Sequence, residues 1–133
     1  MYASILYDVG GALVAFGVGL IIPTLIIAVV EAVVMFLLKW GNFRRSLWIS
    51  LLMNVTSTIF GIGGVLVGSF TIFTDISIWL AVAIAFLLSV LIEGAVLLLS
   101  KRNAVRLNWS ASLIANIASY LLVILPLAWL INS

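Results

Sequence analysis

Four polar residues could carry chemistry because each lies inside a long apolar stretch: Glu31, Asn54, Glu93 and Asn116. Ionisable residues in such stretches are uncommon and often belong to ion pathways through membranes. Two glutamates could therefore relay protons or cations across the inner leaflet. Alternatively, a carboxyl and a carboxamide can exchange hydrogen bonds, most simply when the carboxyl is protonated, so that each Glu–Asn pair fastens one helical hairpin. We favour the fastening role, since no further acidic residue continues a pathway outward from either glutamate.

The composition excludes several kinds of site. The chain has neither cysteine nor histidine. This absence excludes disulfides, Cys/His zinc sites, histidine-ligated haem and catalytic pairs of serine or cysteine with histidine. We therefore expect no catalytic residues, no metal site and no cofactor, in a protein that is not an enzyme. The net charge of +2 gives no indication of nucleic acid as a partner.

The elements that position these residues must be helices that cross lipid. The chain is 66% hydrophobic and 8% charged, whereas a soluble domain is about 45–50% apolar and about 25% charged. A bilayer span needs about 20 apolar residues, and four stretches qualify: 17–38, 46–68, 77–99 and 108–131. The sequence predicts an all-α membrane protein, with four transmembrane helices in a single membrane domain. We expect residues 1–16 to form an outer segment with a short interfacial helix; a longer, kinked first span is the alternative.

The basic residues indicate an orientation. All six lie in or beside the two short turns that join paired spans: Lys39, Arg44, Arg45, Lys101, Arg102 and Arg106. Basic turns stay in the cytoplasm, so we expect both termini outside it, in a bacterial inner membrane, with the turns near lipid headgroups. Tryptophan prefers membrane interfaces. We expect that position for all five tryptophans, three beside the basic turns and two at the outer boundary: Trp40, Trp48 and Trp109, then Trp79 and Trp129.

A shift of 62 residues brings the two halves of the chain into register. Glu93 follows Glu31 at that distance, and Asn116 follows Asn54. Further identical pairs are Lys39 with Lys101, Arg44 with Arg106, Ser50 with Ser112, and Ser57 with Ser119. Because polar residues are rare in membrane helices, we interpret these matches as two hairpin repeats, 17–68 and 77–131. Each copy spans the membrane twice, so the copies have parallel topology about an axis along the membrane normal.

Small and polar residues follow a heptad spacing in the second stretch. They are separated by 4, 3, 4, 3 and 4 positions: Ser50, Asn54, Ser57, Gly61, Gly64 and Gly68. The fourth stretch keeps the polar part of this pattern, Ser112, Asn116 and Ser119. Small side chains let a neighbouring helix approach closely. The seam could dock a partner protein, or it could pack inside the bundle itself, which we favour.

Both hairpins contain the pattern E-x(7)-K-x(4)-R-x(5)-S-x(3)-N-x(2)-S, which begins at Glu31 and again at Glu93. With Gly61 following, the first copy resembles the membrane hairpin of the cyanobacterial filament-integrity (septal) proteins and of small bacterial inner-membrane proteins. The resemblance implies a non-enzymatic structural or assembly role in the inner membrane.

Two functions fit these features. We favour a structural or accessory subunit of a larger membrane-protein complex. Its partners would be membrane lipids and other integral membrane subunits, or a second copy of this chain. The alternative is a small proton- or cation-handling channel or transporter that uses Glu31 and Glu93.

Overall fold

The structure is a computed structural model that describes residues 21–68 and 77–132. Every regular element in these ranges is a helix. The first helix is Ile21–Leu37, followed by α2 (Phe43–Gly68), α3 (Ile78–Ser100), α4 (Val105–Ser119), η1 (Tyr120–Ile124) and α5 (Leu125–Asn132). The described residues are therefore helical, as predicted, and the ends of the later helices differ from the predicted ones by a few residues. The predicted start of the first stretch, at residue 17, lies outside the described residues. The expected outer segment 1–16 lies outside the described residues.

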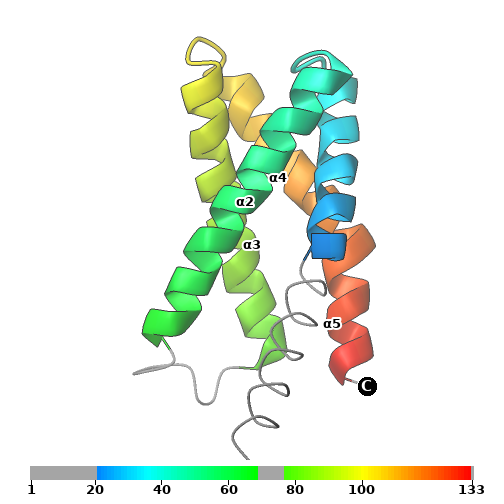
Figure 1. The fold of residues 1–133 in the computed structure, drawn as a ribbon, viewed down its shortest axis with the longest axis vertical. Coiled ribbons are helices and arrows are strands. Elements are labelled where there is room, and N and C mark those ends of the chain that lie inside the picture. Colours follow the sequence, from blue (N-terminus) through cyan, green and yellow to red (C-terminus); the bar gives the residue numbers. More distant parts are fainter. Residues whose placement is uncertain (1–20, 69–76, 133) are drawn as a thin grey trace, which may run out of the picture.

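The helices form two hairpins whose turns lie at the same end of the bundle (Figure 1). The first turn closes at Lys39, which adopts a left-handed φ of 57°. Asn42 then starts α2, because its Oδ1 accepts the backbone N–H of Arg45 at 2.8 Å and so satisfies a free amide at the helix N-terminus. The second turn, residues 101–104, joins α3 to α4. The basic residues consequently gather at one end of the bundle.

The last helix of the bundle is interrupted. Between α4 and α5, η1 is a π-helical turn in which the N–H of Leu125 bonds to the carbonyl of Tyr120. Pro126 accounts for the interruption, because its ring has no N–H to donate and clashes with the carbonyl four residues before it. A wider turn relieves that conflict. The widened turn directly follows Ser119, the last polar residue of its seam.

The distribution of apolar side chains is inverted relative to a water-soluble protein. Two helices, Trp79–Ser100 and Val105–Leu130, are long and apolar enough to cross a membrane, and the described part of the first helix is apolar but shorter. Large apolar side chains are exposed on every one of the four long helices, for example Leu37, Trp48, Leu87 and Trp129. Within the described ranges, nine polar residues are buried beside nine apolar ones. Water-soluble proteins bury mainly apolar residues.

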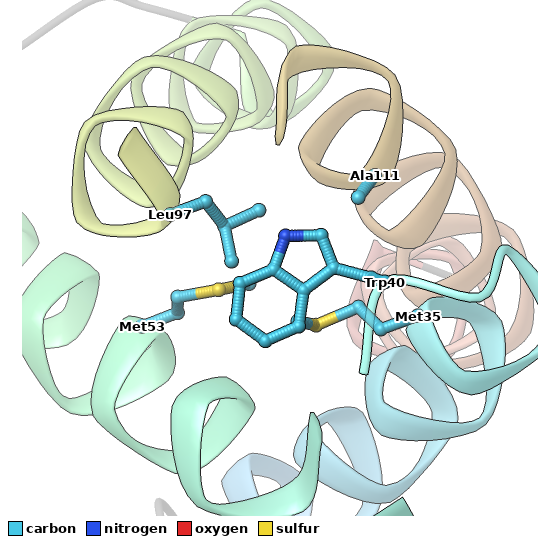
Figure 2. Close-up of a cluster of buried hydrophobic side chains, with 5 residues drawn as sticks. All are labelled: Met35, Trp40, Met53, Leu97 and Ala111. Atoms are coloured by element: carbon cyan, nitrogen blue, oxygen red, sulfur yellow. The ribbon is translucent and has the colours of Figure 1, made fainter. Parts of the chain in front are cut away.

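A cluster of buried apolar side chains lies near the basic turns. It consists of Met35, Trp40, Met53, Leu97 and Ala111, which we call the Trp40 layer. Figure 2 shows the indole of Trp40 in the middle of the bundle, with the other four side chains reaching it from the surrounding helices. These buried side chains therefore pack together in the interior of the bundle, near its basic end.

The side chain of Trp40 lies inside the bundle and not on its surface, where tryptophans that contact a membrane interface are exposed. Only 1% of the side chain is exposed. Its indole N–H donates to Asn108 Oδ1 at 2.8 Å, and Asn108 Nδ2 donates to the carbonyl of Lys101 at 2.7 Å. The Lys101 ammonium in turn donates to the carbonyl of Trp40 at 3.1 Å. A ring of polar contacts with the second turn thus holds the indole inside, which the sequence alone did not indicate.

Candidate functional site

Glu31 lies in the first helix and is 1% exposed. Three side chains donate to its carboxyl. From α2, Ser50 Oγ lies 2.9 Å and Asn54 Nδ2 lies 2.5 Å from Oε2. From α4, Ser119 Oγ lies 3.2 Å from Oε1. The expected contact with Asn54 is therefore present, and Ser119 adds a partner from the other hairpin.

Glu93 occupies the equivalent place in α3 and is equally buried. Asn116 Nδ2 donates to its Oε2 at 2.6 Å, and Ser57 Oγ donates to its Oε1 at 3.2 Å. Each glutamate therefore binds an asparagine of its own hairpin and a serine of the opposite hairpin. We call this set the glutamate network: Glu31, Ser50, Asn54, Ser57, Glu93, Asn116 and Ser119. The two carboxyl groups line the same cavity, and like charges in one site repel each other when both are ionised.

The asparagines are held by their own helices. Asn54 Nδ2 also donates to the carbonyl of Ser50 at 3.0 Å, and Asn116 Nδ2 donates to the carbonyl of Ser112 at 3.0 Å. Such bonds to the preceding turn fix the rotation of the amide. As a result, each amide presents N–H groups to the carboxyl.

The two halves differ at one serine. Ser50 Oγ donates to Glu31, whereas its counterpart Ser112 donates to the carbonyl of Val90 at 2.8 Å. Glu31 therefore has one donor more than Glu93. The two carboxyl groups are equivalent in position but differ in their surroundings.

Ser57 and Ser119, which we call the crossed serines because each bonds to the glutamate of the opposite hairpin, determine what the network can do chemically. Ser57 Oγ lies 3.2 Å from Glu93 Oε1 and 3.2 Å from the carbonyl three residues before it. Ser119 Oγ lies 3.2 Å from Glu31 Oε1 and 3.1 Å from the corresponding carbonyl. A hydroxyl has one proton to donate but can also accept. It can therefore donate to an ionised carboxyl, or donate to the carbonyl and accept from a protonated one, without a change of position.

A cavity of about 650 Å³ borders the network. Both glutamates and both asparagines line it, and its other lining residues lie on the helix halves away from the basic turns, such as Thr24, Ala81 and Ile124. The Trp40 layer lies on the opposite side of the network, towards those turns. The carboxyl groups therefore stand at the inner end of a cavity that extends away from the basic end.

The polar residues and the glycines of the predicted small-residue seam have different surroundings. Its polar part faces the bundle interior, where Ser50, Asn54, Ser112, Asn116 and Ser119 are buried and Ser57 is half-buried. Gly61 borders the cavity, and a Cβ added there would meet no described atom within 4 Å, so no described helix approaches closely at that point. Gly64 and Gly68 lie in the last turns of α2, where their surroundings fall outside the described residues.

The basic residues take no part in the network. Lys39, Arg44, Arg102 and Arg106 are exposed at the turns. Arg45 places its guanidinium carbon 5.3 Å from the centre of the Trp40 ring and donates to the carbonyl of Ser100 at 3.4 Å. The roles of the basic residues in orientation and in headgroup contact stay predictions.

Two groups at the site were not anticipated from the sequence. Gly94, next to Glu93, packs so tightly on the Trp109 ring that an added Cβ would lie 2.4 Å from Cζ3. Tyr120 lines the cavity and stacks edge-on against Phe86, with ring centres 5.1 Å apart. The 62-residue register gave a signal for the first, because it aligns Gly94 with Ala32, another small residue.

Comparisons with known proteins do not place this chain in a family. No protein-family model, no curated protein and no solved structure matches this chain. The resemblance of its hairpins to the septal proteins accordingly stays a prediction.

Proposed function

We propose that the chain is an integral membrane protein in which all four long helices cross the bilayer. The inverted distribution of side chains supports this proposal. Many aliphatic and aromatic residues are exposed on the outside of the bundle, while as many polar as apolar residues are buried in its described part, and such a surface is stable against lipid. By the positive-inside rule, the basic turns face the cytoplasm and the cavity opens towards the outer face.

We further propose that the glutamate network holds and passes a proton or another monovalent cation. One observation carries this proposal: both carboxyl groups, Glu31 and Glu93, border one cavity inside the bundle. A carboxyl buried only to fasten helices needs no such access. The crossed serines support the same function, since they let a carboxyl gain or lose a proton while its contacts stay in place.

In this proposal, the Trp40 layer is the barrier to a cation that moves from the glutamate network towards the cytoplasm. It separates the glutamate network from the cytoplasmic turns, so a cation that reaches the carboxyl groups from outside is held there until the layer opens. Apolar constrictions gate membrane pathways by excluding water. We therefore propose that the site is accessible from the outer side in this conformation, with the Trp40 layer as the barrier on the inner side.

Proton movement into reconstituted vesicles tests the proposed function. A potassium gradient with valinomycin sets the membrane potential, and a trapped pH-sensitive dye reports proton entry. We expect the wild-type chain to pass protons and the Glu31→Gln/Glu93→Gln variant to match empty vesicles. Glutamine keeps the size and the acceptor oxygen of glutamate but cannot exchange a proton.

Thr56→Ala provides a matched control. The Thr56 hydroxyl bonds to the carbonyl of Leu52 in its own helix, outside the network, so this variant should pass protons like the wild type. Circular dichroism establishes that all variants are folded. Equal proton entry for the wild type and the folded glutamine variant would contradict the proposed function.

A structural accessory subunit is the second candidate, and a specific observation favours it. Every described side-chain partner of the two carboxyl groups lies on a neighbouring helix, so the network also joins the two hairpins. If the network only joins the hairpins, the Glu31→Gln/Glu93→Gln variant should keep the four helices packed, because glutamine can still make hydrogen bonds. Leucine at both positions should loosen that packing. An accessory subunit should also co-purify with stoichiometric partners in mild detergent, and a chain that runs alone would argue against that role.

A further inference from the structure

The walls and the inner end of the cavity have different chemistry. Aliphatic side chains form much of the wall, among them Ile84, Leu88 and Ile92 of α3. The inner end carries the two carboxyl groups of the glutamate network. The cavity therefore offers an apolar surface that ends in acidic groups.

The charge of the cavity favours a cation. None of the described residues that line it is basic, and all six basic residues of the chain lie at or beside the turns. An ionised carboxylate in apolar surroundings is strongly destabilised unless it is paired. A positive charge placed between Glu31 and Glu93 would supply the missing counter-charge and relieve their mutual repulsion. An anion in that position would instead be repelled by both ionised carboxylates.

The size and polarity of the wall restrict the body of that cation. A volume of about 650 Å³ lies within the roughly 300–1,000 Å³ typical of small-molecule sites. A small hydrated ion would leave the aliphatic wall in contact with water, which is unfavourable. An apolar body would instead bury that wall, and the aromatic side chain of Tyr120 lines the same cavity.

We infer that the cavity binds a lipophilic organic monocation, with its charge at Glu31 and Glu93 and its apolar body along the α3 wall. This inference rests on the proposed function, because it names the substrate class of the same carboxyl groups. Binding is an exchange. The O–H bond of a protonated carboxyl breaks, the proton passes to bulk water, and the resulting carboxylate pairs with the bound cation, so the net charge of the cavity is unchanged.

Equilibrium dialysis of the detergent-solubilised full chain with radiolabelled tetraphenylphosphonium tests the inference. We expect saturable binding of one cation per chain, with one proton released into weakly buffered solution. The Glu31→Gln/Glu93→Gln variant should bind about tenfold more weakly or worse, because it lacks the charge-assisted contact. Tetraphenylborate, an anion of the same shape, should be retained equally by both proteins, since it only partitions into the detergent.

Two substitutions in α3 keep the test valid if the glutamine variant fails to fold. Ala85→Trp places a large ring in the cavity, while Ala83→Trp changes an exposed residue of the same helix that is not part of the cavity lining. Only the Ala85 variant should lose phosphonium binding. Equal binding by these two variants, or by the wild type and a folded glutamine variant, would overturn the inference.

The outcomes separate this inference from the proposed function. If proton entry depends on the two glutamates but phosphonium does not bind, the inference fails and the proposed function stands. If phosphonium binds through the glutamates but proton entry does not depend on them, the cavity assignment stands and proton passage is refuted.

Discussion

Replacing Gly94 with alanine should displace the indole of Trp109. In the structure an added Cβ would lie 2.4 Å from Cζ3 and 2.6 Å from Cε3 of that ring. Carbon atoms in contact are separated by about 3.5 Å or more, so the ring must move by about 1 Å. The obstacle is a rigid ring rather than the flexible end of a side chain, so the whole ring has to move.

The size of the effect follows from the surroundings of the ring. Overpacking a tight contact destabilises a protein by about 1–3 kcal/mol. Trp109 is only half-buried and can move partly outward, so we expect the lower half of that range. Gly63→Ala is the matched control, because a Cβ at that helical glycine meets no described atom within 4 Å. It should be neutral or stabilise by up to about 1 kcal/mol through helix propensity.

The internal repeat supplies a rescue. Ala32 and Leu47 occupy the positions of Gly94 and Trp109 in the first hairpin. If the hairpins are equivalent, Gly94→Ala should be harmless in a Trp109→Leu background, because that double variant recreates the pair of the first hairpin. The two substitutions should therefore show a favourable coupling energy of about 1 kcal/mol or more.

The assay is reversible unfolding in mixed micelles titrated with sodium dodecyl sulfate and followed by circular dichroism, which does not depend on the deleted tryptophan. A Gly94→Ala variant as stable as the Gly63→Ala control would refute the packing argument. An equal cost of Gly94→Ala in both backgrounds would refute the equivalence of the hairpins.

The same unfolding assay checks three further substitutions. Trp40→Phe removes the indole N–H and leaves the buried Oδ1 of Asn108 without its donor, so we expect a loss of about 1–3 kcal/mol; no loss would contradict the role of that bond. Lys39→Gly relieves a left-handed backbone conformation at φ 57° and should stabilise by up to about 1 kcal/mol, whereas a loss of stability would show that the lysine side chain matters more than the backbone. Ser119→Ala removes the bond to Glu31 that joins the hairpins and should cost about 0.6 kcal/mol, a typical value for interhelical bonds in membranes; a cost near zero would indicate that the crossed bond is dispensable.

Local patterns in the sequence predicted the helices and half of the network. Apolar stretches between basic turns gave the helical ranges, because hydropathy acts along the chain. Glu31 and Asn54 lie at similar distances from the first basic turn, which predicted their contact, and the 62-residue register repeats the same arrangement as Glu93 and Asn116. These contacts depend only on helix rise and turn length, which the sequence contains.

Contacts between the hairpins could not be derived in the same way. Ser57 reaches Glu93 and Ser119 reaches Glu31 only because of the angle at which the hairpins pack, and no local pattern encodes that angle. The burial of Trp40 was not predicted for a related reason. An indole near basic residues is typical of a membrane interface, but here Asn108 of the other hairpin accepts its N–H inside the bundle. The cavity that Tyr120 and Ile124 help to line likewise depends on three-dimensional packing.

The most direct test of the membrane-embedded cavity uses a single cysteine at Ala85, which lines it. The chain has no cysteine of its own, so a membrane-impermeant maleimide would report this position alone. In right-side-out membrane vesicles we expect labelling that slows when tetraphenylphosphonium is present, and in inverted vesicles we expect almost none. Labelling from the cytoplasmic side, or equal labelling from both sides, would contradict a cavity that opens outward and is closed by the Trp40 layer.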